Sequence, residues 1–510
     1  MNTNIKLRQF LFIIGLLLVS GIISSQVLHV GAGQQYATLG DAIDDVVPGE
    51  TILVHAGTYN GGLFSGDLQG TSAGWISIFA APGEIVTFEG GSNAWQFSDA
   101  AYLHIRGFIF QHQTGNGVNF DDGGSYETPA HNVIFEDCIF RDMNASGNND
   151  LLKLSGLDDF EIRNCTFFNG ASGGSGIDMV GCHDGLIINT HFENLGSNSI
   201  QAKGGTANIR IEANKFKNGG ARAVNLGGST GLPFFRPIDA PYEAAELKVY
   251  SNIFIGSQAP IAFVGCINSE VINNTIYLPE NWVIRILQET VDTTRFAPCG
   301  FNTFRNNIIY MDDQVNVECN IGPNTAPETF TFSNNLWYQS DDPNWNGPDL
   351  PVDDVDQIIN QDPLFDDTAA ENFDVLLTSP AVGSGIDVPD PEDDYNGDNF
   401  ISPRSIGAFE SGTVTAIDDP SSDTIDKISD RIKVYPNPAS GTIHIQFPEK
   451  LDEAISVALY TADGKVIWSE KRVMTKEDIG ILQVDQLHIG CYILMIKMQF
   501  QVVQKLIWLQ

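Results

Sequence analysis

The chain has few basic residues for its length: 27 Lys and Arg stand against 64 Asp and Glu among 510 residues, and the formal net charge is −37. Phosphate contacts require clustered Lys and Arg, so this composition argues against a nucleic-acid-binding protein. The excess of acid is instead typical of a solvated extracellular surface.

Long apolar runs are also lacking. The apolar stretch of residues 10–23 is too short for a membrane span. It follows the basic residues Lys6 and Arg8 and is followed by two small serines. Residues 1–25 are therefore predicted to be a secretory signal peptide, and no membrane span is expected in the mature protein.

Closely spaced cysteines are absent from the sequence, which argues against a cysteine-type metal site. Cys138 and Cys165 lie 27 residues apart, each two residues before a phenylalanine. They are expected to stack as buried thiols rather than to form a disulfide, although secretion would permit one.

Glycine and phenylalanine are abundant, with 50 and 31 copies, as in a turn-dense all-β chain. Within residues 176–228, the segments GIDMVGCHDGLIIN and SIQAKGGTANIRIE align at an offset of 23 residues, and RAVNLGGS continues the series. One aromatic residue marks each repeat: Phe110, Phe140, Phe167, Phe192, Phe216, Phe254, Tyr277, Tyr310 and Tyr338. Such a period predicts a solenoid of stacked parallel strands, a parallel β-helix.

Asparagine or a small polar residue precedes most of these aromatics, as in Asn214-Lys215 and Asn273-Asn274-Thr275. Like side chains on successive parallel strands can bond to one another, so these residues are expected to form a structural ladder.

The N-terminal part predicts a strand, a short helix over residues 39–46 capped by Thr38, and a second strand at residues 51–55. This arrangement resembles the N-terminal cap of secreted pectin-lyase-like proteins, which are right-handed parallel β-helices. The segment RSIGAFE at residues 404–410 resembles the closing segment of such proteins. Residues 26–410 are thus assigned to one β-helix domain.

Residues 411–429 have the small, polar and acidic composition of a linker. Residues 430–510 are expected to form a small antiparallel β-sandwich. The motifs VYPNPASGTIHI, GCYILMI and KLIWL resemble the C-terminal sorting domain of the type IX secretion system of Bacteroidetes. The resemblance implies contact with that machinery, delivery to the outside or to the cell surface, and removal of the domain on export. The alternative is a generic carbohydrate-binding β-sandwich.

Strand alternation selects the candidate site. If Ile177, Met179, Ile200 and Ala202 face the core, then Asp178, Gln201 and Lys203 face outward, and the next repeat would add Arg222 and Val224. Residues 203–222 hold five basic residues and one acid, which suggests an anionic ligand. Arg210, Lys215 and Lys217 are more simply explained as solvated charges.

The segment IQAKGGTANIRIEANKFKNGGARAVNLGG resembles polysaccharide lyase family 6, the family of alginate lyases and chondroitinase B. Lys203 matches the lysine that opens a Lys-Ser-x-x-Asn segment in that family. The family's Leu-Arg-His-Gly segment falls on Asn225-Leu226-Gly227 here, so Arg222 is the nearest arginine.

The resemblance implies β-elimination from a uronate-containing polysaccharide. Lys203 would accept the proton next to the carboxylate, Arg222 would stabilise the developing charge, and His183 is a second candidate acid or base. A lysine among other cations loses its proton more readily and can serve as the base. Ca²⁺ is a possible cofactor, with Asp178 or Glu212 as ligands.

An insertion after residue 228 carries aromatic and basic residues that could form a wall that stacks on sugar rings and clamps carboxylates, namely Phe234, Phe235, Arg236 and Tyr242. The alternative is a loop folded on its own aromatics. Arg285 is expected to extend the groove.

Three functions remain open: a polysaccharide lyase, a glycoside hydrolase that uses paired carboxylates, and a non-catalytic glycan-binding adhesin. The protein is expected to be a monomer.

Overall fold

The computed structural model describes residues 26–125 and 128–410, together with seven strands beyond residue 432. The predicted signal peptide (1–25) and linker (411–429) lie outside the described residues. The chain divides into two compact units, Met1–Thr413 and Val414–Gln510.

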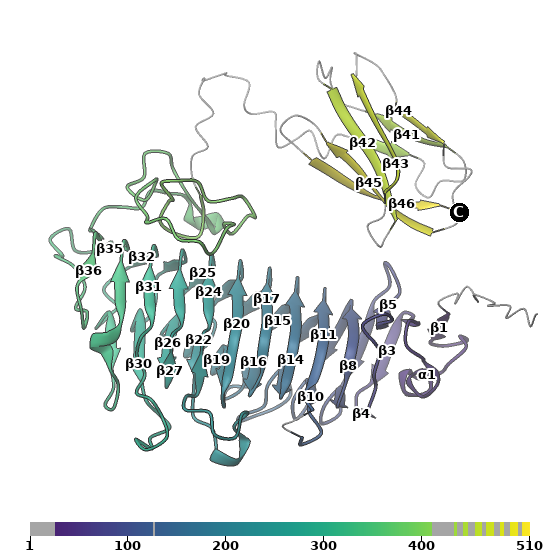
Figure 1. The fold of residues 1–510 in the computed structure, drawn as a ribbon, viewed down its shortest axis with the longest axis horizontal. Coiled ribbons are helices and arrows are strands. Elements are labelled where there is room, and N and C mark those ends of the chain that lie inside the picture. The colour runs from purple at the N-terminus through teal and green to yellow at the C-terminus, as the bar shows by residue number, and fades with distance from the viewer. Residues whose placement is uncertain are drawn as a thin grey trace, which may run out of the picture. The chain divides into compact units, whose positions relative to one another are not determined.

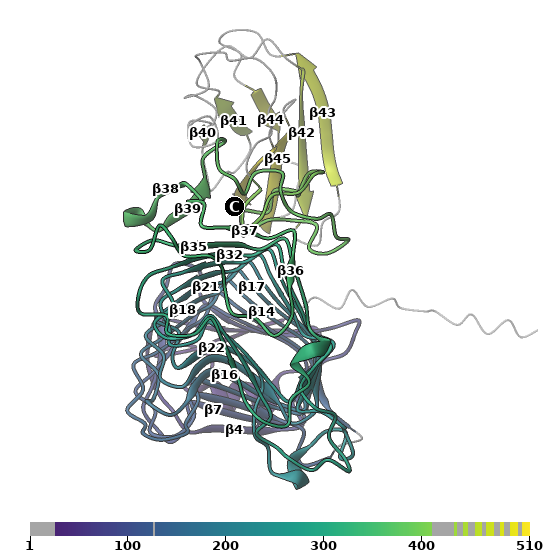
Figure 2. The same cartoon turned by 90° about the vertical axis from the view of Figure 1, so that its left-hand side faces the viewer.

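Unit 1 is a parallel β-helix in which each turn adds one strand to each of three long sheets (Figures 1 and 2). The predicted all-β solenoid is confirmed. Sheet A contains β1 (Val27–Val30), β2 (Thr51–Val54), β5 (Ile76–Ala80), β8 (Ala101–Arg106), β11 (Ala130–Glu136), β14 (Leu157–Arg163), β17 (His183–Ile188), β20 (Thr206–Glu212), β23 (Ala244–Ala245), β24 (Lys248–Tyr250), β27 (Cys266–Ile267), β28 (Glu270–Ile272), β31 (Thr303–Arg305), β34 (Thr331–Ser333) and β36 (Asp354–Val355).

Sheets B and C form the other two walls. Sheet B contains β3 (Gly57–Asn60), β6 (Val86–Glu89), β9 (Phe108–Gln111), β12 (Ile139–Arg141), β15 (Thr166–Phe168), β18 (His191–Glu193), β21 (Lys215–Lys217), β25 (Ile253–Ile255), β29 (Thr275–Tyr277), β32 (Ile308–Met311), β35 (Leu336–Gln339) and β37 (Ile358–Ile359). Sheet C contains β4 (Leu63–Gly66), β7 (Trp95–Ser98), β10 (Val118–Asp121), β13 (Leu152–Ser155), β16 (Ser175–Val180), β19 (Asn198–Lys203), β22 (Arg222–Gly227), β26 (Ile261–Val264), β30 (Ile284–Leu287) and β33 (Cys319–Ile321).

The corners between sheets explain the abundance of Asn and Asp. Between sheets A and B the chain turns through left-handed residues such as Asn164, Asn189 and Asn273, with φ of 54°, 51° and 55°. Asn and Asp tolerate this conformation better than other residues with a Cβ atom, since their short side chains bond locally.

Aromatic rings stack through the core along sheet B. Successive rings from Phe110 through Phe140, Phe167, Phe192 and Phe216 to Phe254 have centroids 4.6–5.1 Å apart. The ring stack does not continue to Tyr277, because Ile276 pairs with Phe254 and Tyr277 is one residue out of step. Tyr277, Tyr310 and Tyr338 form a separate column in register.

The predicted asparagine ladder is present beside this stack. Asn214, Asn252, Asn274, Asn307 and Asn335 are fully buried, and each side-chain amide donates to the Oδ1 of the next at 3.0–3.1 Å. The ladder pairs polar groups that would otherwise be costly to bury.

Cys138 and Cys165 are buried free thiols, as expected. Burial raises the pKa of Cys165 well above that of a solvated thiol.

Helix α1 (Leu39–Asp45) lies at the N-terminal end, where Leu39 and Ala42 join the core. The Oγ1 of Thr38 accepts a hydrogen bond from the Asp41 amide at 3.2 Å, which confirms the predicted N-cap.

Three single-turn helices lie in loops of unit 1, namely η1 (Leu232–Phe234), η2 (Pro327–Thr329) and η3 (Thr368–Ala370).

The last part of unit 1, residues 339–410, includes the hairpin of β38 (Phe365–Asp367) and β39 (Asn372–Val375). Residues 339–410 fold back over the earlier turns of the solenoid. Glu371 lies 2.5 Å from Lys215 and 2.8 Å from Lys217, and Asp390 lies 3.5 Å from Arg210. Arg210, Lys215 and Lys217, which were assigned to solvent, are therefore paired with acidic residues of this segment.

Unit 2 consists of two antiparallel sheets, as predicted for a small β-sandwich. One contains β40 (Lys433–Tyr435), β41 (Thr442–Gln446) and β44 (Gly480–Gln483), and the other β42 (Ala454–Thr461), β43 (Val466–Val473), β45 (Gly490–Lys497) and β46 (Val502–Leu509). Among the residues described in both units, no helix is long and apolar enough to cross a bilayer.

Candidate functional site

A polar column runs across the outer face of sheet C. In the register of the parallel strands, Lys153 on β13 lies beside Asp178 on β16, and Asp178 lies beside Gln201 on β19. The flanking Ile177, Met179, Ile200 and Ala202 are fully buried in the core. Strand alternation therefore places Asp178 and Gln201 on the outer face, as predicted.

These side chains form one ionic cluster. Asp178 Oδ2 is in direct contact with Lys153 Nζ, and its Oδ1 lies 3.1 Å from Lys203 Nζ. Lys203 Nζ also donates to Gln201 Oε1 at 2.9 Å. The Asp178 side chain is only 1% exposed, against 20% for Lys153 and 12% for Lys203. Two lysines thus compensate a buried carboxylate, and Lys203, which was expected among other cations, lies beside an acid as well.

A second carboxylate lies beneath the cluster. Asp150 Oδ2 is 3.7 Å from Lys153 Nζ, and its Oδ1 accepts from the Ser175 amide at 2.8 Å. Burial, followed by the nearby charge of Asp178, raises the pKa of Asp150 to about 6. Burial by itself would lower the pKa of Lys153, but Asp178 and Asp150 raise it overall.

The cluster opens into a cleft of about 570 Å³. The described charged residues that line it are three bases, Lys153, Lys203 and Arg236, and one acid, Asp122. Burial raises the pKa of Asp122. Phe234 also lines the cleft and is 68% exposed. The cleft thus combines amines with an aromatic ring open to solvent.

One wall of the cleft is the predicted insertion, which Glu243 holds against β19. Glu243 is fully buried and accepts hydrogen bonds from the Gly204 amide at 2.9 Å and from the Thr230 amide at 2.9 Å and hydroxyl at 2.7 Å. Gly204 follows Lys203 directly, so this carboxylate fixes the wall next to the amine.

Arg236 anchors the same wall to sheet A. Its guanidinium donates to both carboxylate oxygens of Asp158, at 2.6 and 2.5 Å, and to the Gly181 carbonyl at 2.9 Å. Burial opposes ionisation of Asp158, but the hydrogen bonds of Arg236 and His183 lower its pKa to about 2. Arg236 therefore holds the loop in place, and the expectation that it clamps a substrate carboxylate is not met in this structure.

His183 belongs to that anchor as well. Its Nδ1 lies 2.9 Å from Arg236 Nη1 and 3.1 Å from Asp158 Oδ1, and its Nε2 is 3.1 Å from the Gly205 carbonyl, which can only accept. The carbonyl contact requires a proton on Nε2. Both ring nitrogens are thus engaged, which does not fit a role in proton transfer.

Phe235 and Tyr242 face away from the cleft. Phe235 is fully buried, packs against Phe296 at 5.2 Å, and is covered by the guanidinium of Arg295 at 4.6 Å. Tyr242 packs against the same cluster. The role predicted for Phe235 in stacking on sugars is therefore wrong, and the neighbouring Phe234 occupies the exposed position.

Arg222 and Val224 are displaced from the predicted column by one residue. Ile200 pairs with Val224, which is buried, and Gln201 pairs with Asn225. The offset on this rung is 24 residues, not 23. Arg222 begins β22 and is paired with Glu289 at 2.6 Å, so it does not line the cleft.

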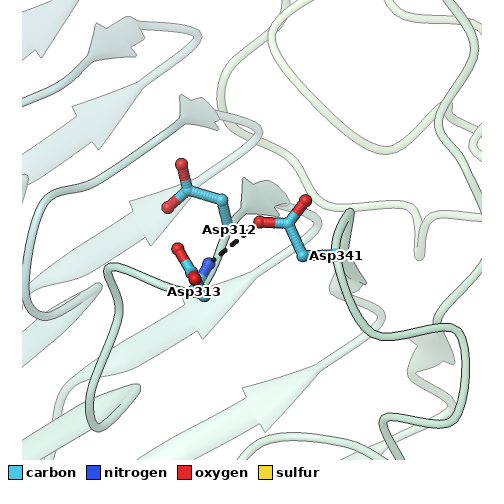
Figure 3. Close-up of side chains that lie close together, drawn as sticks. All are labelled: Asp312, Asp313 and Asp341. Atoms are coloured by element: carbon cyan, nitrogen blue, oxygen red, sulfur yellow. Dashed lines mark hydrogen bonds between the residues drawn. The ribbon is translucent and has the colours of Figure 1, made fainter.

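The proposed ligands for Ca²⁺ do not fit a cation. Asp178 is occupied by two ammonium groups, and Glu212 accepts from the Arg210 guanidinium at 2.8 and 3.1 Å. Asp312, Asp313 and Asp341 bring carboxylate oxygens within 4.8 Å of one another on the turns after β32 and β35 (Figure 3). Asp312 accepts from Gln314 within its own turn. An exposed acidic cluster does not by itself define a metal site.

Sequence reasoning missed Lys153, Asp150, Asp158 and Glu243. A signal existed for Lys153, because LLKLSG at residues 151–156 repeats the alternation of IDMVG one turn earlier. Asp150, Asp158 and Glu243 act through contacts with residues of other turns, and no local sequence pattern indicates such contacts.

Comparison with known families agrees with the two units. Residues 86–276 match the model of the right handed beta helix region, and residues 433–509 match the secretion system C-terminal sorting domain. The molecule is thus a right-handed β-helix protein. It carries the sorting domain of the type IX secretion system, and is therefore exported to the cell surface or beyond.

Solved structures with similar folds include the pectate lyase Pel9A, with 12% identity and a TM-score of 0.48 over 76% of this chain and 98% of that one. An alginate lyase from Paenibacillus sp. has 16% identity and a TM-score of 0.38 over 61% and 97% of the two chains. XylC in complex with xylose has 11% identity and a TM-score of 0.45 over 76% and 98%. Identities this low do not assign an activity. A comparison with curated proteins gave no match.

Proposed function

We propose that this exported protein is a polysaccharide lyase that cleaves an anionic, uronate-containing glycan by β-elimination. The observation that carries the proposal is the cleft over sheet C, where described basic residues outnumber acidic ones in a chain with 64 acids and 27 bases. A local excess of amines on so acidic a protein favours an acidic ligand.

The charge of the cluster supports this. With a pKa of about 6, Asp150 is largely protonated below that pH. Lys153 and Lys203 then face a single ionised partner, Asp178, and the cluster carries a net positive charge. The carboxylate of a bound uronate would then balance the second ammonium charge.

Elimination needs a base for the proton next to the carboxylate and a cation for the charge that develops. We assign the first role to Lys203, whose amine lines the cleft, and the second to Lys153. Phe234 offers an aromatic face for a sugar ring. Arg222 is left out of the chemistry because it does not line the cleft, and Arg236 and His183 are left out because they hold the cleft wall to Asp158.

Lys203 lies 3.1 Å from Asp178 Oδ1 as well as lining the cleft, and a substitution tests its role as the base directly. Lys203→Arg keeps the positive charge but removes an acceptor, because a guanidinium hardly deprotonates. Loss of activity in this variant supports the assignment, whereas retained activity makes Lys203 an electrostatic group.

A glycoside hydrolase is less well supported. It needs two accessible carboxylates roughly 5 to 9.5 Å apart. Among the described residues that line the cleft, Asp122 is the single acid, and Asp178 is covered by its lysines.

The test is to incubate the protein with alginate, polygalacturonate and chondroitin while recording the ultraviolet absorbance of the conjugated double bond that elimination creates. Reducing ends without this absorbance would indicate hydrolysis. Binding without the conjugated double bond and without new reducing ends would indicate an adhesin.

Light scattering of the same samples tests the expectation of a monomer. N-terminal sequencing of the secreted protein tests the proposed signal peptide.

A further inference from the structure

The outer column of sheet C continues beyond the cleft. Gln201 pairs in register with Asn225, Asn225 with Ala262, and Ala262 with Arg285 on β30. Three strand spacings separate Gln201 from Arg285, which corresponds to about 14 Å along the solenoid. Arg285 therefore lies on the same face as Lys203, and a linear polymer that follows the solenoid axis would reach both.

The guanidinium of Arg285 is held but not neutralised. Its Cζ lies 4.4 Å above the ring of Trp282, and its Nε donates to Asn320 Oδ1 at 3.0 Å. These contacts leave both Nη groups without a hydrogen-bond acceptor within the described parts of the chain. No carboxylate among those residues lies within 4.0 Å of Arg285, although acids outnumber bases in this protein.

The surroundings of Arg285 also oppose its charge. Burial lowers the pKa of this guanidinium, the nearby Arg222 lowers it further, and Glu289 only partly compensates. Glu289 is itself bound to Arg222 at 2.6 Å. A half-buried guanidinium beside a second one is stabilised by an anionic ligand.

We propose that Arg285 and Trp282 form a second subsite for an acidic sugar, in which the free edge of the guanidinium binds the oxyanion of a carboxylate or sulfate ester. A planar guanidinium matches such groups with two parallel hydrogen bonds, and the indole adds an apolar face. The inference deepens the proposed function, because it takes the bound glycan to be the one that is cleaved.

Chain length is the consequence that can be measured. A pyranose in an extended chain is about as long as one strand spacing, so the anionic groups at Lys203 and Arg285 would belong to sugars about three residues apart. A tetramer or longer chain engages both subsites and gains affinity from the linkage, whereas a dimer engages only one.

The experiment is calorimetric titration with uronate oligomers from dimer to hexamer, in the Lys203→Arg background, where cleavage should be blocked. Arg285→Gln is expected to weaken hexamer binding about tenfold or more and to leave dimer binding unchanged. Arg305→Gln is the matched control, since Arg305 on β31 of sheet A likewise donates its Nε to one neutral side chain, Ser333, at 2.7 Å. It should bind all lengths as the background does.

An equal loss for dimer and hexamer, or no loss for either, would overturn the second subsite. Arg285→Gln could abolish the length dependence of binding while the protein with Lys203 intact produces no conjugated double bond. That result would support the subsite and overturn the lyase proposal. If none of the oligomers binds, the subsite proposal and the lyase proposal both fail.

Sulfated and unsulfated chondroitin hexamers distinguish the two oxyanions. A preference for the sulfated form that disappears in Arg285→Gln assigns sulfate to the subsite, and equal affinity for the two forms assigns carboxylate.

Discussion

Two surfaces of the same solenoid carry cations from one short stretch of sequence, and they differ in what covers them. Lys203 on sheet C faces a cleft, whereas Lys215 and Lys217 on sheet B are paired with Glu371 from the segment at residues 339–410. The difference shows that outward orientation on a strand does not make a binding site. Lys203 also has a counter-ion, Asp178, but it lines a cleft, whereas Lys215 and Lys217 are paired with a later segment that folds back over their sheet.

The largest effect is expected from Lys203→Ala. Removing the proposed base should lower kcat/KM on the cleaved polymer by about 10² to 10⁴. Lys215→Ala removes an amine from the covered surface and should leave the rate unchanged. Steady-state rates of double-bond formation provide the measurement, and similar losses in both variants would abolish the distinction between the surfaces.

Asp178→Asn should lower the free energy of unfolding more than a matched change at the ion pairs of sheet B. It leaves two lysines near a buried site without their shared carboxylate, at a cost of about 3 to 5 kcal/mol. Glu371→Gln, which breaks pairs that are about 30% exposed, should cost less than about 1 kcal/mol. Urea denaturation followed by tryptophan fluorescence compares the two, and equal shifts in midpoint would contradict the ranking.

Asp158 predicts a pH dependence of stability. Its folded pKa of about 2 lies below the usual 3.8, so its contribution is fully present above about pH 4 and is lost as the pH falls through about 2. The contribution is at most about 2 kcal/mol. Stability measured between pH 5 and 2 should fall less steeply in Asp158→Asn, together with greater protease sensitivity of the cleft wall at neutral pH. An unchanged slope would show that Arg236 does not depend on this carboxylate.

Asp150 predicts the smallest effect, on binding. Because its pKa is raised to about 6, it ionises as the pH rises through that value and cancels the net positive charge of the cluster. Affinity for a uronate oligomer should therefore decrease severalfold between about pH 5 and 7. Calorimetry over this range should show a flat profile in Asp150→Asn. A fall in affinity over this pH range that persists in Asp150→Asn would assign the titration to another group.

The sequence by itself determined the solenoid, the buried thiols, the asparagine ladder and the outward position of Asp178 and Gln201. These features follow from the two-residue period of a strand and from the stacking of similar repeats, which are local properties. The sorting domain was identified separately, from the resemblance of its motifs to a known family.

Only the tertiary structure decided which polar groups remain open. The extra residue before β22 moved Asn225, not Val224, beside Gln201. Arg236 reaches Asp158, 78 residues away, and the covered lysines find their acid more than 150 residues later in the chain. Such pairings depend on where distant turns and loops meet in space, and ion pairing acts over a few ångströms regardless of sequence separation, so no local pattern can report them.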